Sequence, residues 1–106
     1  MTRIGFLLKV KPEKIDEYKA RHTAVWPEML DALRSTGWHN YSLFLRNDGM
    51  LIGYVETQDF DRAVEAMSKS EVNARWQREM RDYFEGDGGR DPDRQLELLQ
   101  QVFYLP

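Results

Sequence analysis

The sequence predicts an α+β domain built from one antiparallel sheet with helices on one of its faces. Two observations support this prediction. Apolar residues alternate with period two in segments at the start and in the middle of the chain, and other segments have apolar residues at helical spacing. A chain of 106 residues is long enough for one compact domain and too short for two ordinary ones. We therefore expect residues 1–106 to form a single domain.

Composition excludes several classes of protein. Apolar residues make up 42% and charged residues 31% of the chain, a balance typical of globular domains. No apolar run approaches the length of a membrane span, and the first residues lack the long apolar stretch of a signal peptide, so we expect a cytoplasmic protein with no membrane partner. The net charge of −3, with both signs interspersed, argues against a nucleic-acid partner. Without cysteine, histidines and carboxylates remain as the reactive groups.

The first strand is predicted over residues 3–11, where apolar side chains occupy every second position. Pro12 ends this strand and begins a helix, because proline is favoured in a first helical turn. The inner face of that helix carries Ile15, Tyr18 and His22.

Pro27 interrupts the helical hydrogen bonds, so a second helical segment is expected to begin there. Its apolar stripe consists of Met29, Leu30 and Leu33. Gly37 is expected to end it in the left-handed conformation.

The second strand follows Gly37, and the period of two assigns its side chains to opposite faces. On this pattern His39 and Tyr41 point the same way, together with Leu43 and Leu45. The other face is predicted to carry Trp38, Asn40, Ser42 and Phe44. Asn47, Asp48 and Gly49 tolerate positive φ and predict a tight hairpin into a third strand over residues 50–56.

Two helical segments and a final strand complete the chain. Asp59 or Asp61 is expected to cap the first helix, and Ser70 the second. Their apolar stripes are Ala63, Val64 and Met67 in the first, and Val72, Trp76, Met80, Tyr83 and Phe84 in the second. Residues 86–94 read as a polar connector and lack the lysine of a phosphate-binding loop. Residues 98–106 are apolar and predict a strand that pairs with another segment.

The order β-α-β-β-α-β is the split ferredoxin-like plan, in which helices cover only one face of the antiparallel sheet. Apolar residues such as Leu7 and Phe44 also occur at positions predicted for the uncovered face. We therefore expect a homodimer in which two sheets pack face to face and the C-terminal strand helps to join them.

Tyr18, His22 and Trp26 recur four residues apart and share one helical face. An imidazole between two aromatic rings is suited to binding and protonating a small organic ligand. The same spacing is also typical of core anchors around a half-buried histidine, and the spacing alone leaves both interpretations open.

Several segments together resemble the L-rhamnose mutarotases, small dimeric α/β-barrel proteins. The resemblance extends over essentially the whole chain and rests on Arg21-His22, Trp26-Pro27-Glu28, His39-Asn40-Tyr41, Arg75-Trp76 and the terminal Val102-Phe103-Tyr104-Leu105-Pro106. It implies an isomerase that interconverts the α and β anomers of L-rhamnose or a related deoxyhexose.

The resemblance also implies roles for individual residues. It makes His22 the proton donor and Tyr18, Tyr41 and Trp76 the residues that hold the sugar. Gln77 stands where the family often has a second tryptophan, and its amide can hydrogen-bond a hydroxyl without supplying the same apolar surface. Thr23 and Ala24 follow His22 where relatives commonly have a proline, which should affect the helix bend more than the chemistry.

Mutarotation needs an acid at the ring oxygen and a base at the anomeric hydroxyl, and it needs neither a metal nor a cofactor. The sequence leaves the second group open among His39, Glu28 and water. For Trp76 and Trp26 a core role is the alternative, and Trp26 is expected to pack under the bend at Pro27. Two other functions remain in view, a dimeric α/β-barrel monooxygenase and a sugar-binding or interaction module without catalysis.

Overall fold

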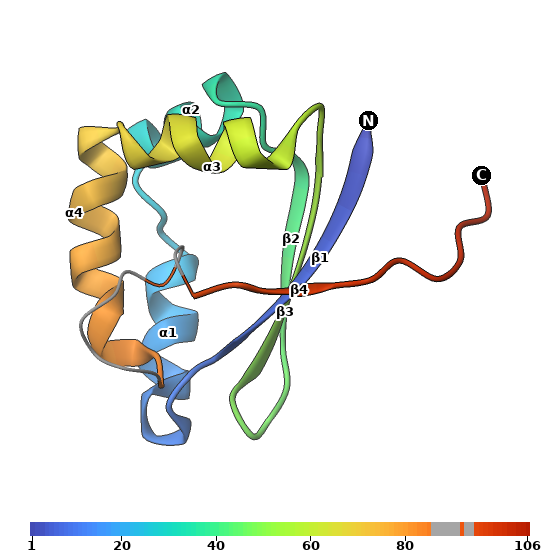
Figure 1. Cartoon of the computed structure of the whole chain (residues 1–106). Coiled ribbons are helices and arrows are strands. Elements are labelled where there is room, and N and C mark those ends of the chain that lie inside the picture. Colours follow the sequence, from blue (N-terminus) through green and yellow to red (C-terminus); the bar gives the residue numbers. More distant parts are fainter. Residues whose placement is uncertain (86–91, 93–94) are drawn as a thin grey trace.

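The structure is a computed structural model that describes residues 1–85, 92 and 95–106 (Figure 1). Most of the predicted connector over residues 86–94 lies outside these described ranges. The elements, in chain order, are β1 (Thr2–Lys9), η1 (Pro12–Lys14), α1 (Ile15–His22), α2 (Pro27–Ser35), β2 (His39–Leu45), β3 (Met50–Thr57), α3 (Phe60–Ser68), α4 (Glu71–Met80), η2 (Arg81–Tyr83) and β4 (Glu97–Leu99). None of the helices in the described part of the chain is long and apolar enough to cross a membrane.

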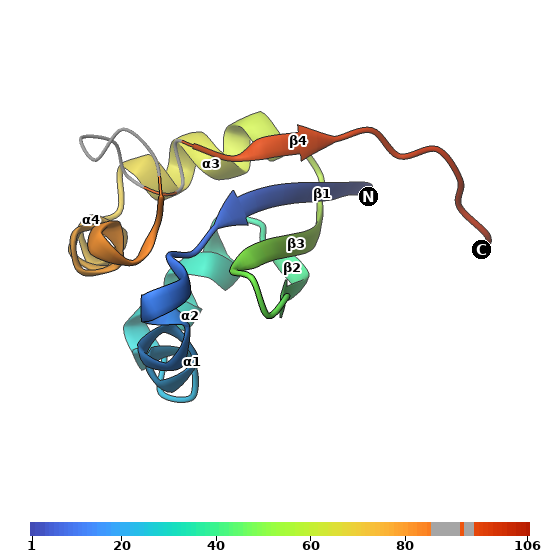
Figure 2. The same cartoon turned by 90° about the horizontal axis from the view of Figure 1, so that it is seen from below.

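The four strands form one antiparallel sheet in the order β2-β3-β1-β4, and the helices lie on one side of it (Figures 1 and 2). This arrangement confirms the predicted ferredoxin-like plan. The hydrophobic core lies between the sheet and the helices, because every second residue of the central strands points to the helical side. Phe6 of β1 and Leu51 and Val55 of β3 are at most 1% exposed.

The first strand is shorter than predicted at its C-terminal end. It ends at Lys9, and Val10 forms an isolated bridge with Phe84. The amide of Lys11 donates to the carbonyl of Tyr83 at 2.7 Å. The predicted strand over residues 3–11 is therefore wrong at residues 10 and 11, because the chain leaves the sheet there to bond the segment that follows α4.

The turn and cap residues occur where the sequence predicts them. Gly37 has φ of 96° after α2, and Gly49 has φ of 99° in the hairpin between β2 and β3. Of the two candidates for the cap of α3, Asp59 accepts a hydrogen bond from the amide of Arg62 at 3.1 Å. Ser70 caps α4 by accepting from the amide of Asn73 at 3.3 Å.

A β-bulge in β2 overturns the predicted faces of its first residues. His39 pairs with Glu56, whereas Ser42 pairs with Tyr54, so the strand contains one extra residue between these pairs. Paired residues share a face, which puts His39 on the outer face with Tyr54. Trp38 is buried on the helical side, and its ring centroid lies 5.1 Å from that of Tyr41. The predictions that His39 and Tyr41 share a face, and that Trp38 faces away, are therefore wrong.

The C-terminal segment pairs over a shorter stretch than predicted. Within this segment only the residues of β4 pair with β1, in the register Gly5 with Leu99 and Leu7 with Glu97. Residues 100–106 extend past the edge of the helical layer (Figure 1), and Val102 and Phe103 are 88% and 77% exposed. The predicted strand over residues 98–106 is therefore wrong beyond Leu99 within this single chain, where the tail has contacts with Arg3 but no strand partner.

Candidate functional site

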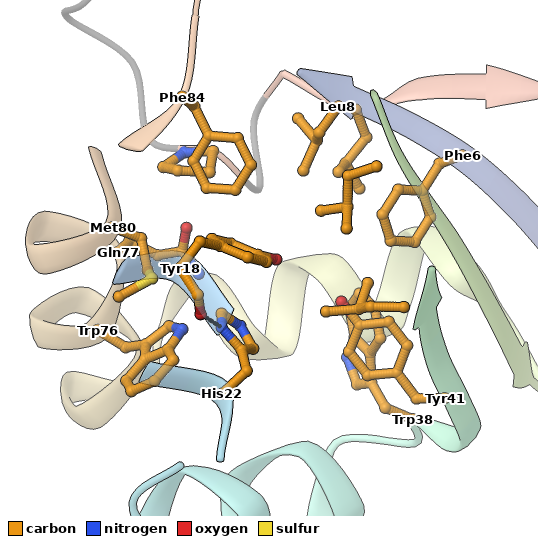
Figure 3. A pocket seen from close by; sticks show the side chains of 14 residues that line it. Phe6, Leu8, Tyr18, His22, Trp38, Tyr41, Trp76, Gln77, Met80 and Phe84 are labelled. Atoms are coloured by element: carbon orange, nitrogen blue, oxygen red, sulfur yellow. Dashed lines mark hydrogen bonds between the residues drawn. The ribbon is translucent and has the colours of Figure 1, made fainter. Parts of the chain in front are cut away.

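A cavity of about 360 Å³ lies between the sheet and the helices, and a smaller pocket of about 80 Å³ adjoins it. Figure 3 shows side chains of α1 and α4 on one side of the smaller pocket and side chains of β2 on the other. The residues that line both hollows are His22, Trp38, Tyr41, Leu43, Trp76 and Gln77. Tyr18 lines the smaller one. The five residues assigned to the sugar site from the sequence therefore meet around one connected space.

His22 is the last residue of α1 and is half-buried. Its ring stacks on that of Tyr18 at a centroid distance of 4.1 Å and meets the edge of the Trp76 ring at 5.6 Å. Nδ1 donates a hydrogen bond of 2.9 Å to the main-chain carbonyl of Tyr18. Because a carbonyl oxygen can only accept, Nδ1 carries the proton of the neutral ring. Proton exchange with a ligand is thereby left to Nε2.

The environment of His22 favours its neutral form. Burial lowers the pKa of His22 below its usual value, the hydrogen bond to Tyr18 opposes this effect, and the charge of Arg21 adds to it. A lowered pKa makes the imidazolium a stronger acid. The ring therefore gives up a proton at Nε2 readily and is neutral again afterwards.

The two tyrosines reach the site from different elements. Tyr18 of α1 is 5% exposed, and its ring meets the edge of Phe84 at 5.6 Å. Burial raises the pKa of Tyr18, and the neighbouring hydroxyl of Tyr41 contributes to this shift. Tyr41 of β2 is more exposed, and its ring lies 6.3 Å from that of Phe6. The hydroxyl of Tyr18 therefore remains protonated at neutral pH and, like that of Tyr41, can donate as well as accept hydrogen bonds.

Trp76 of α4 forms the wall opposite β2 and is held by contacts on several sides. The ring of Trp26 meets it edge-on at 5.0 Å, and the guanidinium of Arg21 lies 5.5 Å from its centroid. Arg21 also forms an ion pair of 2.8 Å with Glu79, which links α1 to α4. Trp26 lines neither hollow and packs beneath the site, directly before Pro27.

Two buried amides occupy the part of the wall next to Trp76. The Nδ2 group of Asn73 donates to the carbonyl of Met67 at 3.0 Å, and the Nε2 group of Gln77 donates to Oδ1 of Asn73 at 3.0 Å. Both side chains line the larger cavity. Asn73 thus ties the amide of Gln77 to the end of α3 and fixes its orientation.

With the geometry described, comparison with known proteins decides the family. A model of the L-rhamnose mutarotase family matches residues 3–105. The chain belongs to the L-rhamnose mutarotase family. A family member from Pectobacterium carotovorum is 38% identical over 99% of both chains, and one from Escherichia coli O1:K1 / APEC is 35% identical over the full length of both. A protein of the same name from Oceanobacillus iheyensis is 42% identical over 72% of this chain and 73% of its own length.

The fold of the L-rhamnose mutarotases has also been seen in a crystal. The crystal structure of an L-rhamnose mutarotase from Formosa agariphila superposes on this chain with a TM-score of 0.80, covering 100% of both chains at 24% sequence identity. At that identity the likeness supports the fold alone.

Two residues of the chain depart from the sequence-based expectations for the site. His39 lines neither of the two hollows that contain His22, because the bulge turns it to the outer face. Trp38 lines both, although the period of two assigns it to the opposite face. Asn73 was also not identified as a site residue from the sequence. Its spacing of four residues from Gln77 could have indicated it, because this spacing puts the two amides on one helical face.

The remaining candidate groups lie away from this space. Glu28 is exposed in the first turn of α2 and lines neither hollow. Within the described ranges, no three histidine, aspartate or glutamate side chains are grouped in a way that could hold a metal ion.

Proposed function

We propose that this chain interconverts the α and β anomers of L-rhamnose or a closely related deoxyhexose. The main support for the proposal is the orientation of His22. Its Nδ1 donates a hydrogen bond to the carbonyl of Tyr18, and its ring lines the cavity. Membership of the L-rhamnose mutarotase family supplies the substrate class. The size of the larger cavity, about 360 Å³, falls in the range typical of small-molecule sites.

In the proposed reaction His22 donates the proton from Nε2 to the ring oxygen of the sugar. The bond between that oxygen and the anomeric carbon breaks, and the anomeric hydroxyl loses its proton as it becomes the aldehyde oxygen. The aldehyde carbon then turns its opposite face to the hydroxyl that was the ring oxygen. Ring closure forms the bond again, Nε2 takes its proton back, and the aldehyde oxygen regains a proton from water to become the new anomeric hydroxyl. No atom is gained or lost in the cycle.

The other site residues hold the sugar during this cycle. The hydroxyls of Tyr18 and Tyr41 bind sugar oxygens, and the indole of Trp76 covers an apolar face of the sugar that includes its methyl group. Gln77 binds a hydroxyl through its amide. Its buried position beside Asn73 supports this role, because a ligand atom that meets a fixed amide gains a hydrogen bond at little entropic cost.

Water is the proposed acceptor of the proton from the anomeric hydroxyl. Leu30 and Tyr41 line the larger cavity and are 37% and 36% exposed, so the cavity reaches the surface. His39 and Glu28, the two other candidates, line neither hollow.

A homodimer in the cytoplasm completes the proposal. The outer face of the sheet exposes apolar side chains, with Phe44 at 60% and Ile52 at 41%, and the tail adds Val102 and Leu105 at 88% and 77%. An apolar surface of this kind is stabilised when a second copy covers it. Cell fractionation followed by an immunoblot tests the location.

The decisive experiment measures anomer exchange of L-rhamnose by saturation-transfer NMR, with the uncatalysed exchange subtracted. The wild-type chain should accelerate exchange, and His22→Gln should reduce the acceleration by at least about 100-fold, the usual contribution of general acid–base catalysis. His39→Gln is the matched control, because it removes the second histidine from outside the cavity and should keep wild-type exchange.

The outcomes separate the competing functions. A wild-type chain that accelerates exchange of none of the deoxyhexoses tested would refute the mutarotase function. A chain that binds L-rhamnose without accelerating exchange is the result expected of a binding module. If His22→Gln exchanges anomers as fast as the wild type, the reaction stands and the assignment of His22 is wrong.

A further inference from the structure

Trp38 and Tyr41 lie side by side on the strand wall of the cavity although they are three residues apart (Figure 3). Their ring centroids are 5.1 Å apart. In a regular strand, residues three apart point to opposite faces of the sheet. Trp38 and Tyr41 can therefore line the same wall only if the backbone between them departs from regular strand geometry.

Asn40 is the residue at which the departure occurs. Its φ is +47°, and it is the only residue other than glycine with positive φ in the described part of the chain. The register of β2 against β3 shifts by one residue between His39 and Ser42. A left-handed residue within a one-residue register shift is the geometry of a β-bulge that re-aims side chains.

We propose that Asn40 is a positioning residue whose left-handed backbone places the rings of Trp38 and Tyr41 together on the sugar-facing wall. This inference rests on the proposed function only in taking that wall to contact the sugar. The bulge has two effects at once, since it turns Trp38 inward and His39 outward. The aromatic wall and the exclusion of the second histidine follow from the same backbone conformation.

The contacts of each ring depend on this orientation. The indole Nε1 of Trp38 donates to the carbonyl of Ala63 in α3 at 3.4 Å, and its ring meets that of Phe60 at 5.7 Å. The ring of Tyr41 lies near that of Phe6 on β1, across the intervening strand β3. Without the extra residue Trp38 would face away from α3, and Tyr41 would lose its contact with the ring of Trp38.

The role is assigned to the backbone of Asn40 because its side chain is exposed. Asparagine, aspartate and glycine adopt positive φ more easily than other residues, alanine does so less well, and valine is strongly disfavoured there. A backbone role therefore predicts a specific order among substitutions, in which glycine preserves what alanine loses.

The test compares Asn40→Gly, Asn40→Asp, Asn40→Ala and Asn40→Val by two measurements. The first is the set of NMR cross-peaks between the ring protons of Trp38 and Tyr41, which requires no activity. The second is the split between KM and kcat in anomer exchange of L-rhamnose. Asn40→Gly and Asn40→Asp should keep the cross-peaks and hold KM within about twofold of the wild type.

Asn40→Ala should weaken the cross-peaks, and Asn40→Val should abolish them and raise KM about tenfold with a smaller change in kcat. If Asn40→Val does not fold, the comparison of Asn40→Gly with Asn40→Ala still distinguishes a backbone role of Asn40 from a side-chain role. Equal losses in Asn40→Gly and Asn40→Ala would assign the role to the side chain and overturn the proposal. So would wild-type cross-peaks in Asn40→Ala and Asn40→Val. A wild-type chain without mutarotase activity would refute the proposed function and leave the cross-peak test of the bulge intact.

Discussion

The imidazole of His22 is bonded to the main chain of Tyr18 and stacked on its ring at the same time. The hydrogen bond from Nδ1 measures 2.9 Å, and the ring centroids are 4.1 Å apart with an interplanar angle of 30°. One turn of α1 therefore fixes both the exchanging nitrogen and the phenol next to it. This pairing allows the hydroxyl of Tyr18 to be removed without disturbing the ring that orients His22.

Tyr18→Phe should raise KM for L-rhamnose roughly three- to tenfold, because one hydrogen bond contributes about 0.5–1.5 kcal/mol. The free energy of unfolding should change by less than about 1 kcal/mol, since the ring keeps its packing against Phe84. Exchange NMR and urea unfolding measure the two quantities. Tyr54→Phe on the outer face is the control and should leave KM unchanged. Equal KM values for both variants would contradict a sugar contact at Tyr18.

The rate of anomer exchange should rise as the pH falls from 8 and level off below the pKa of His22, because the donor must be protonated. Burial lowers that pKa, so the midpoint should lie below about 6.5, the usual value for histidine. Exchange NMR gives the profile, and the ring proton signal that is lost in His22→Gln gives the titration. A midpoint at or above the usual value would contradict the prediction.

The lowered pKa of His22 also makes the free energy of unfolding depend on pH. Between the lowered pKa of folded His22 and about 6.5, the unfolded chain binds more protons than the folded chain. The contribution of His22 to the free energy of unfolding is therefore fully present above this window and is lost as the pH falls through it. Urea unfolding of the wild type and His22→Gln across this range isolates the contribution, which should be absent in the variant.

Arg21→Gln should raise the pKa of His22, because the charge of Arg21 lowers it. The pH profile of exchange should move to higher pH. The lost ion pair with Glu79 should cost less than about 1 kcal/mol, since both side chains are partly exposed. Arg75→Gln is the matched control, because the guanidinium of Arg75 lies over Trp26 instead of Trp76. Identical profiles for the two variants would show that Arg21 has no influence on His22.

Asn73→Ala should lower the free energy of unfolding by about 1–3 kcal/mol. The substitution removes the donor to the carbonyl of Met67 and the acceptor of the Gln77 amide inside the protein. KM should rise as well, because Gln77 loses the group that orients it. Thermal unfolding and exchange NMR provide the measurements. Asn47→Ala in the exposed hairpin should stay within about 0.5 kcal/mol of the wild type, and a similar loss in both variants would argue against a special role for Asn73.

Removal of residues 100–106 should convert the proposed homodimer to a monomer, because the tail carries the most exposed apolar side chains of the chain's described part. Sedimentation velocity distinguishes the two states. Phe103→Asp should have the same effect in milder form, whereas Ser68→Asp adds a charge to the exposed helical side and should leave the dimer intact. A monomeric wild type would refute the homodimer directly.

Local rules of sequence accounted for most of the fold. Asp59, Ser70, Gly37 and Gly49 occupy caps and turns that depend only on neighbouring residues, and these were predicted correctly. The β-bulge in β2 was not predicted. A period of two assigns side chains to faces by counting residues, so it cannot show where the strand contains an extra one. Asn40 near the start of the predicted strand was the available signal, since asparagine is uncommon in strands and tolerates positive φ.

The site residues likewise divide into those that local sequence could predict and those that depend on the folded chain. Helical spacing alone put Tyr18 and His22 on one face. The position of Trp76 against them depends on α1 packing beside α4, and no spacing within the chain encodes it, so the family resemblance was needed to connect these residues. The contribution of Asn73 depends on its partner at the end of α3, which only the folded chain brings within reach.

The pairing of β4 with β1 also bears on how the chain is made. β4 follows every other element in the chain order, yet its partner β1 precedes them all. Until β4 emerges, the sheet has the order β2-β3-β1 and β1 is an edge strand with unpaired main-chain groups along one side. The growing chain therefore presents an edge that can pair wrongly until β4 emerges, and the charged side chains of Arg3 and Lys9 on β1 are of the kind that disfavours such pairing.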